Sequence, residues 1–204
     1  MVSSYPVQFD VDIPTRPLSR LTTAFRLLVA IPIVVLLTML SGQTFQDDDN
    51  QRALVVGGAA VFLPLVLMLV FRQKYPRWWF DWNLNLLRFS NRVTVYLALL
   101  DDRYPSTDEE QSVHLDFAYP DAKQLNRWLP LVKWLLAVPH YVVLFFLWIG
   151  AAFAIVGAWF AILFRGTYPQ ALSRYVVGVL RWNNRVTAYA FTLVTDQYPP
   201  FSLS

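Results

Sequence analysis

The 204-residue chain contains no cysteine and only two histidines. Without cysteine it forms no disulfide, has no thiol nucleophile and holds no metal through thiolates. Charged residues are also scarce, at 15% of the chain, where an average soluble domain has roughly 25%. Because 56% of the chain is hydrophobic, the shortage of charge indicates a protein that is embedded in a lipid bilayer.

The chain carries an internal repeat. The sequence FRQKYP at residues 71–76 recurs as FRGTYP at residues 164–169, and NRVTVY at residues 91–96 recurs 93 residues later as NRVTAY. Eleven of the 26 positions from 71 to 96 are identical to their counterparts. Self-similarity at a fixed offset indicates a duplicated structural unit.

We therefore divide the chain into a first repeat at residues 1–105 and a second at residues 106–204. Crossing a bilayer takes ~20 apolar residues, and four stretches qualify: about 21–40, 53–71, 129–147 and 150–164. The last two share one apolar run. Because the repeat requires a second hairpin, we predict a tight turn near residues 148–150; one long tilted helix is the alternative.

Basic residues give the expected orientation. Of the 17 Lys and Arg, Arg52 alone lies in a predicted loop between the two helices of a hairpin. Basic loops stay on the cytoplasmic side, so we expect a multi-pass protein of the inner membrane with both termini in the cytoplasm. Both repeats then share one topology, unlike the inverted repeats of many transporters.

A segment of mixed character follows each hairpin, at about 77–99 and 170–194. In the first segment polar residues recur at helical spacing, as Asp81, Asn85, Arg88 and Arg92, and in the second Arg174, Gly178, Arg181 and Arg185 keep that spacing. This pattern is typical of a helix that lies in the membrane interface. The alternative is a helix packed under the bundle with its arginines in salt bridges. The ends of the two segments, 93–99 and 186–194, are compatible with helix or strand.

Residues near 7–13 and 113–119 alternate between apolar and polar, which predicts short strands. The predicted fold is an all-α membrane protein. It has four transmembrane helices in two parallel helical-hairpin repeats, each followed by an amphipathic interfacial helix, and minor cytoplasmic β-strands.

Basic residues near the predicted membrane boundary are candidates for binding the headgroups of anionic phospholipid: Arg20, Arg26, Arg88, Arg92, Lys133, Arg174, Arg181 and Arg185. Arg26 and Lys133 hold equivalent repeat positions, and we expect both to snorkel to headgroups; lining a polar pocket is the alternative. Small residues at helical spacing favour close helix packing, and they include Gly57, Gly150, Ala154 and Ala158.

His140 falls inside the third predicted span. An ionisable residue within a membrane is a functional candidate, and a neutral imidazole is a common ligand of metals and haem. The sequence shows no partner for it, so packing is the main interpretation. No catalytic triad, phosphate loop or zinc spacing is present. We therefore expect no enzyme activity, no catalytic residue, no metal, no cofactor and no nucleic-acid partner.

Several motifs resemble one known family. They include YPVQFDVD at residues 5–12 and AIP at 30–32, and, in the second repeat, AVPH at 137–140, WFAILF at 159–164 and VGVLRW at 177–182. Together they are similar to two tandem copies of the bacterial domain-of-unknown-function family 4389. The first copy departs from the pattern, since it lacks the histidine after Pro32. The resemblance implies a bacterial inner-membrane protein and no activity.

These features favour a non-catalytic accessory or scaffold subunit of a larger bacterial inner-membrane complex. Its expected partners are other membrane protein subunits and anionic phospholipid. Two alternatives stay open: a transporter or channel for a small solute or lipid, and a protein that holds a metal or cofactor through His140.

Overall fold

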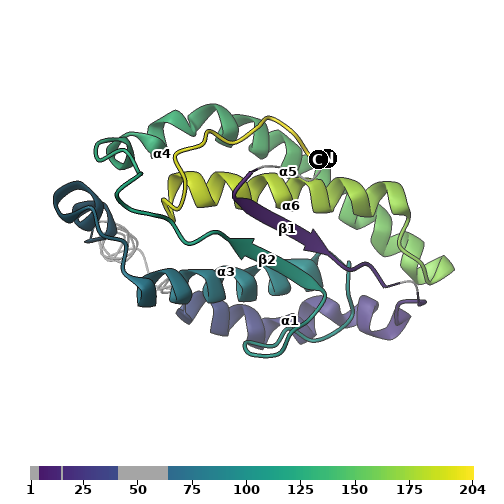
Figure 1. Cartoon of the computed structure of the whole chain (residues 1–204). Helices are drawn as coiled ribbons and strands as arrows, with labels where there is room; N and C mark the ends of the chain where they lie inside the picture. The colour runs from purple at the N-terminus through teal and green to yellow at the C-terminus, as the bar shows by residue number, and fades with distance from the viewer. Residues whose placement is uncertain (1–4, 15, 41–63) are drawn as a thin grey trace, which may run out of the picture.

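The computed structural model describes residues 5–14, 16–40 and 64–204 (Figure 1). Within these ranges the chain is mostly helical and has one two-stranded sheet. The elements are β1 (Val7–Val11), α1 (Arg20–Leu40), the short π-helix η2 (Met68–Arg72), α3 (Arg77–Leu97), β2 (Val113–Phe117), the 3₁₀ turn η3 (Leu129–Leu131), α4 (Lys133–Leu136), α5 (Val138–Arg165) and α6 (Gln170–Ala190). Most of the predicted span at 53–71, with Gly57, lies outside the described residues.

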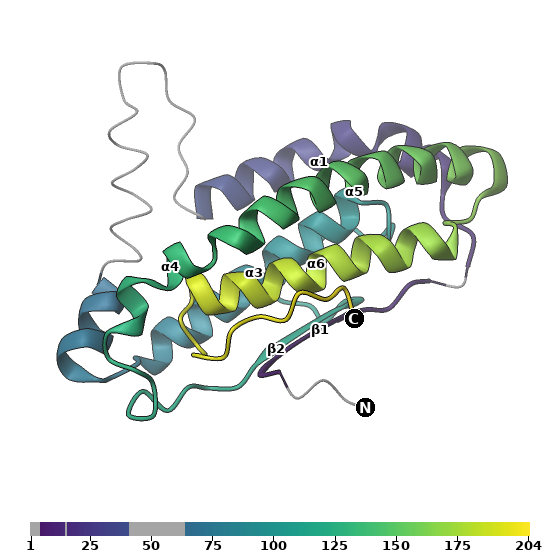
Figure 2. The same ribbon diagram turned by 90° about the horizontal axis from the view of Figure 1, so that it is seen from above.

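The elements stack in three layers (Figure 2). α1 and α5 lie side by side in one outer layer, and α3 and α6 form the middle layer. The sheet covers the far side of the middle layer, where β2 packs on α3 and β1 packs on α6. Hydrophobic packing therefore occurs on both sides of α3 and α6, while no described element covers the outer side of α1 and α5.

The sheet confirms the predicted strands. β1 and β2 pair in antiparallel register with Phe9 opposite Leu115. In each strand alternate side chains are buried against the middle layer, as the period of two requires. The two ambiguous segments, 93–99 and 186–194, begin as helix and contain no strand, since α3 extends to Leu97 and α6 to Ala190 and the remaining residues are turn or irregular.

The predicted turn near residues 148–150 is wrong. α5 runs without a break from Val138 to Arg165, a length of about 42 Å at 1.5 Å per residue. Gly150 lacks a side chain for a different reason, which is close packing: a Cβ there would overlap the Tyr175 hydroxyl of α6. That hydroxyl donates a hydrogen bond to the Leu147 carbonyl at 3.0 Å. The glycine thus admits a neighbouring side chain, and the alternative of one long helix is correct.

α3 and α6 meet at two asparagines in equivalent repeat positions. The Asn91 amide donates to the Asn184 side-chain carbonyl, and the Asn184 amide donates back to Asn91, both at 2.8 Å. Both side chains are buried, and this reciprocal pair satisfies polar atoms that are costly to leave without partners in an apolar interior. Each helix begins directly after a Tyr-Pro pair, whose proline has the extended backbone that suits a helix start.

Candidate membrane interface and buried polar sites

α1 and α5 expose apolar side chains along their whole length. α1 buries one stripe of residues three and four apart (Thr23, Arg26, Ala30 and Ile33), and α5 buries a similar stripe. Only 22% of the most apolar stretch of each helix is buried. We define the apolar face by the exposed side chains of the two helices: Leu21, Phe25, Leu27, Leu28, Ile31, Met39, Val142, Phe145, Phe146, Phe153, Val156, Phe160 and Phe164.

A soluble protein rarely exposes so large a contiguous apolar surface. Leu27 is 78% exposed, and Phe164 at the far end of α5 is 77% exposed. Both helices are long and apolar enough to cross a membrane. Their length, composition and exposure are those of helices in a membrane protein.

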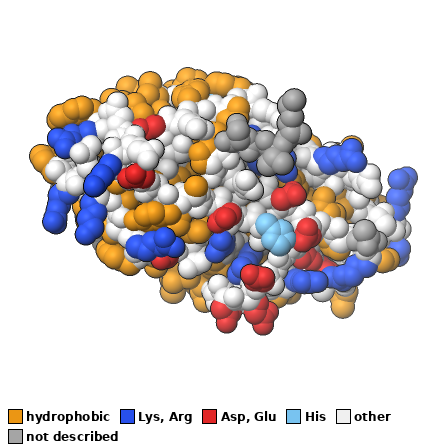
Figure 3. Space-filling view, in the orientation of Figure 1, with side chains coloured by type: hydrophobic (Ala, Val, Ile, Leu, Met, Phe, Trp, Pro, Cys, Tyr) orange, Lys and Arg blue, Asp and Glu red, His pale blue; other side chains and the backbone are white. Residues whose placement is uncertain are grey.

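Basic and tryptophan side chains gather at the two ends of this layer. Exposed tryptophans lie at one end (Trp78, Trp128 and Trp134), near Arg72 and Arg127. Arg20 and Arg165 lie at the other end, where the Arg20 guanidinium donates to the Phe164 carbonyl at 3.3 Å. Figure 3 shows Lys and Arg side chains at both ends of the molecule. Tryptophan and arginine in such positions suit the headgroup region of a bilayer.

The sheet presents the opposite, polar face. Asp10, Asp12, His114 and Asp116 are exposed there, with 73%, 74%, 60% and 78% of their side-chain surfaces accessible. In the view of Figure 3 acidic side chains and a histidine occupy the middle of this face. Asp12 lies 2.7 Å from the His114 ring across the sheet. The two faces of the molecule therefore differ sharply in polarity.

Four predicted headgroup ligands lie between the middle layer and the sheet. Arg88 donates through Nε to the Leu115 carbonyl at 2.9 Å, and Arg181 donates through Nε to the Phe9 carbonyl at 3.0 Å. Each also pairs with an aspartate of the strand that it contacts, Asp116 for Arg88 and Asp10 for Arg181. The alternative of packed helices with paired arginines therefore describes α3 and α6, and the arginine stripe points away from the apolar face.

Arg92 and Arg185 complete this set. Arg92 donates to the Ser106 carbonyl at 2.8 Å and Arg185 donates to the Ser202 carbonyl at 3.4 Å. Desolvation, followed by the charge of the neighbouring arginine in the stripe, lowers the pKa of each; an arginine nonetheless stays protonated. The four guanidiniums line a cavity of about 690 Å³ together with Asp10, Asp116 and Glu110. The carboxylates offset most of the positive charge there.

Arg26 and Lys133 are buried, which corrects the expectation of snorkelling. The Arg26 guanidinium donates to the Tyr96 carbonyl at 2.8 Å and to the Asp101 carbonyl, and it lies 4.4 Å from the centre of the Tyr96 ring. The Lys133 ammonium makes the equivalent contacts: the Thr195 carbonyl and the Asp196 carboxylate, both at 2.7 Å. Both side chains thus anchor the segment that follows the neighbouring amphipathic helix.

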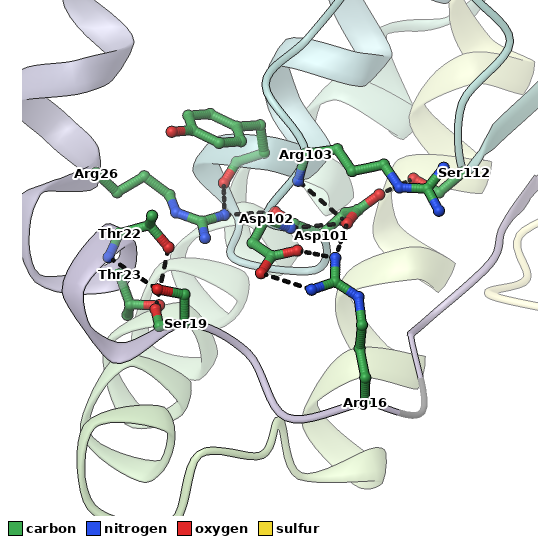
Figure 4. Close-up of polar contacts among 10 residues, drawn as sticks. Arg16, Ser19, Thr22, Thr23, Arg26, Asp101, Asp102, Arg103 and Ser112 are labelled. Carbon is green, nitrogen blue, oxygen red and sulfur yellow. Dashed lines mark hydrogen bonds and ion pairs between the residues drawn. The ribbon is translucent and has the colours of Figure 1, made fainter.

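Figure 4 shows the Arg26 site. Arg26 of α1 approaches the turn after α3 from one side, and Arg16 approaches the Asp102 carboxylate from another. The Asp101 carboxylate accepts hydrogen bonds from the backbone N–H groups of Asp102 and Arg103 and from the Ser112 hydroxyl. Burial alone would raise the pKa of Asp102, but the hydrogen bond and charge of Arg16 outweigh it and lower that pKa.

His140 is completely buried in an aromatic cluster. Its ring stacks on Phe201 at 4.0 Å between ring centres, and Tyr198 lies 4.8 Å away. The Trp182 indole N–H donates to His140 Nδ1 at 3.0 Å. Because an indole nitrogen only donates, Nδ1 is the acceptor and the proton of a neutral imidazole resides on Nε2. Nε2 then has no lone pair to offer a metal or haem, so this geometry does not support ligation.

Among the described residues no cluster of three or more His, Asp or Glu is arranged to hold a metal. Of the predicted packing residues that the structure describes, Ala154 and Ala158 are buried and Gly150 abuts Tyr175. The sequence did not predict the contact between Trp159 of α5 and α1. The Trp159 indole N–H donates to the Thr23 carbonyl of α1 at 3.2 Å. The sequence also did not predict the Asn91–Asn184 pair, although both asparagines belong to the repeated NRVT motif.

The fold and its surfaces define a mostly helical protein in which two exposed apolar helices, each long enough to cross a membrane, form one layer. Residues 128–202, which span η3 to the C-terminal segment, match the family described as Domain of unknown function (DUF4389). The matched segment includes His140, Gly150 and the aromatic cluster. No curated protein and no solved structure matches the chain.

Proposed function

We propose that this protein is a non-catalytic accessory or scaffold subunit of a larger protein complex in the bacterial inner membrane. One observation carries the proposal, which is the apolar face of α1 and α5. A surface of this kind binds lipid and the apolar helices of other membrane subunits. The polar sheet would then lie on the cytoplasmic side with both termini.

The buried polar groups support a structural role. Arg26 and Lys133 each donate hydrogen bonds to main-chain carbonyls and lie over an aromatic ring. His140 Nδ1 is occupied by Trp182. Among the described residues Arg26 Nε and Nη2 and His140 Nε2 are buried without a hydrogen-bond partner. The bonds that the three side chains do form hold loops and helices together.

Two copies of one ancestral unit would account for these contacts. Each copy would supply one strand, one apolar helix and one amphipathic helix. Arg88 and Arg181 are 93 residues apart, and each holds a strand carbonyl. Asn91 and Asn184 have the same separation and contact each other. The repetition of contacts at equivalent positions supports a duplication.

Anionic phospholipid is the proposed lipid partner. Arg20 and Arg174 are exposed, so their guanidiniums are accessible to phosphate groups. Arg26 and Lys133 are buried, so we assign them no headgroup. Transport stays an alternative without a supporting observation. The Lys133 ammonium and one nitrogen of the Arg26 guanidinium bond to main-chain carbonyls, which are fixed.

Purification in mild detergent from native membranes tests the proposed function. A tagged chain should elute as a complex larger than its own 23.6 kDa and its detergent, with a second polypeptide in fixed stoichiometry. Excess untagged chain, added before capture, should displace that polypeptide and leave contaminants unchanged. A monomer without partners would refute the scaffold role, and solute flux through liposomes of the pure protein would favour transport instead.

A further inference from the structure

The orientation of the apolar helices follows from how the three layers are joined. The middle of α1, at Ala30 and Ile33, packs on Phe89 and Val93 of α3. Arg88, the residue directly before Phe89 on α3, donates to the Leu115 carbonyl and pairs with Asp116 of the sheet. The strands therefore lie level with the middle of α1, on the other side of α3.

The second half of the molecule has the same arrangement. Tyr175 of α6 bonds to the Leu147 carbonyl of α5, and Trp182 bonds to His140 of α5. Between these two contacts along α6, Arg181 holds the Phe9 carbonyl of β1. The sheet thus lies beside the stretch of α5 between His140 and Leu147. Figures 1 and 2 show the four long helices running in similar directions beside the strands.

A transmembrane orientation conflicts with this geometry. If α1 and α5 stood along the membrane normal, the sheet would lie at hydrocarbon depth. The exposed carboxylates of Asp10, Asp12 and Asp116 would then face lipid, where ionised side chains are strongly disfavoured. Among the described residues the sheet has two strands, so each of them has an edge that pairs with no other described strand, and open sheet edges do not occur in hydrocarbon.

We propose that α1 and α5 lie in the plane of the membrane, inserted into one leaflet by the apolar face, with the sheet in water. This inference rests on the proposed membrane location. The occupant of the apolar face is a single leaflet that contains anionic phospholipid. Charge supports this choice, since the exposed arginines and tryptophans lie at the ends of the layer and the acidic residues lie on the opposite face.

Because the chain has no cysteine of its own, a cysteine introduced at one position is the single site that a thiol-specific label modifies. Phe146, Phe153 and Phe160 are all at least 50% exposed, and their spacing of seven residues places them on one side of α5. Single Phe→Cys variants carrying a spin label are bound to vesicles of phosphatidylethanolamine and phosphatidylglycerol. Label depth is measured from the accessibility to oxygen and to a water-soluble nickel complex.

In-plane insertion gives the same depth at all three positions. A spanning helix instead places one label about 10 Å deeper or shallower than the next, since seven residues of helix rise about 10 Å. A graded depth of that size overturns the proposal. Because three variants are compared at exposed positions, the loss of one to misfolding leaves the comparison intact.

A second measurement uses an impermeant maleimide on inverted and right-side-out membrane vesicles. Lys123→Cys lies in the loop that leads through η3 and α4 to the start of α5, Thr167→Cys lies just after the end of α5, and Gln8→Cys lies on the sheet; all three positions are exposed. In-plane insertion predicts that all three react from the same side. Reaction of the two end positions from opposite sides refutes it while leaving the membrane role intact, whereas a chain that stays in the soluble fraction refutes the proposed function itself.

Discussion

Replacing Gly150 by alanine tests whether α5 is continuous. In an exposed helix Gly→Ala stabilises by about 1 kcal/mol, because alanine restricts the unfolded chain. Here the new methyl overlaps the Tyr175 hydroxyl, so the tyrosine must move and its hydrogen bond to Leu147 is lost. The lost bond costs about 1 kcal/mol, and overpacking costs about 1–3 kcal/mol more. We expect a net destabilisation of about 1–3 kcal/mol.

The control is the same substitution in a Tyr175→Phe background. The atom that would remain closest to the new methyl is the ring Cζ at 3.3 Å, which a small shift accommodates. There Gly150→Ala should be nearly neutral or slightly stabilising, so the two substitutions are strongly coupled. The free energy of unfolding is measured in detergent micelles by circular dichroism. An equal penalty in both backgrounds would refute the reasoning and favour a glycine-dependent turn.

Three further predictions concern stability. Asn91→Leu or Asn184→Leu alone should cost about 1–3 kcal/mol, because the partner amide is left unsatisfied, and the double variant should cost less than the sum in thermal unfolding. Lys133→Met should cost about 1.5–3 kcal/mol, as expected when hydrogen bonds to a charged group are lost while the partly exposed Asp196 can be hydrated, and should increase proteolysis of the C-terminal segment. The lowered pKa of Asp102 stabilises the fold above the usual carboxyl pKa of about 4, and this contribution is lost as pH falls through the folded-state value. Arg16→Gln should reduce that acid dependence by less than about 1 kcal/mol, since Arg16 is half exposed.

The spacing of apolar and polar residues along the chain predicted both strands and the two amphipathic helices. Alternation over five residues identified both strands, since only one face of each is buried. Helical spacing identified α3 and α6 almost to their ends. The apolar run that became α5 was recognised, but its continuity was not, because hydropathy does not distinguish a glycine in a turn from one that admits a neighbouring ring. Tyr175, the neighbour that decides the case, lies on another helix.

The burial of Arg26 and Lys133 could not be predicted from the sequence either, because it depends on residues far away in the chain. The spacing of Arg26 and Lys133 near the ends of apolar segments suits snorkelling as well as it suits burial. What decides between the two is the position of distant carbonyls: the Lys133 partner Thr195 is 62 residues away, and the Arg26 partner Asp101 is 75 residues away. The equivalent positions of the two cations in the repeat did indicate that they have the same role, because each binds the segment that follows an amphipathic helix.

The polarity of the sheet constrains how the whole chain can meet a bilayer. At the bilayer centre an aspartate costs about 2.5–3.5 kcal/mol, so Asp10, Asp12 and Asp116 together would cost on the order of 10 kcal/mol. That penalty is comparable with the entire stability of a folded domain, about 5–15 kcal/mol. A spanning orientation would therefore have to dissolve the sheet and release Arg88 and Arg181 from the strand carbonyls. Lying in one leaflet avoids that penalty, because the helices gain apolar contact while the carboxylates stay in water. The antiparallel register of β1 and β2, if detected in the membrane-bound chain, is thus itself evidence of an in-plane orientation.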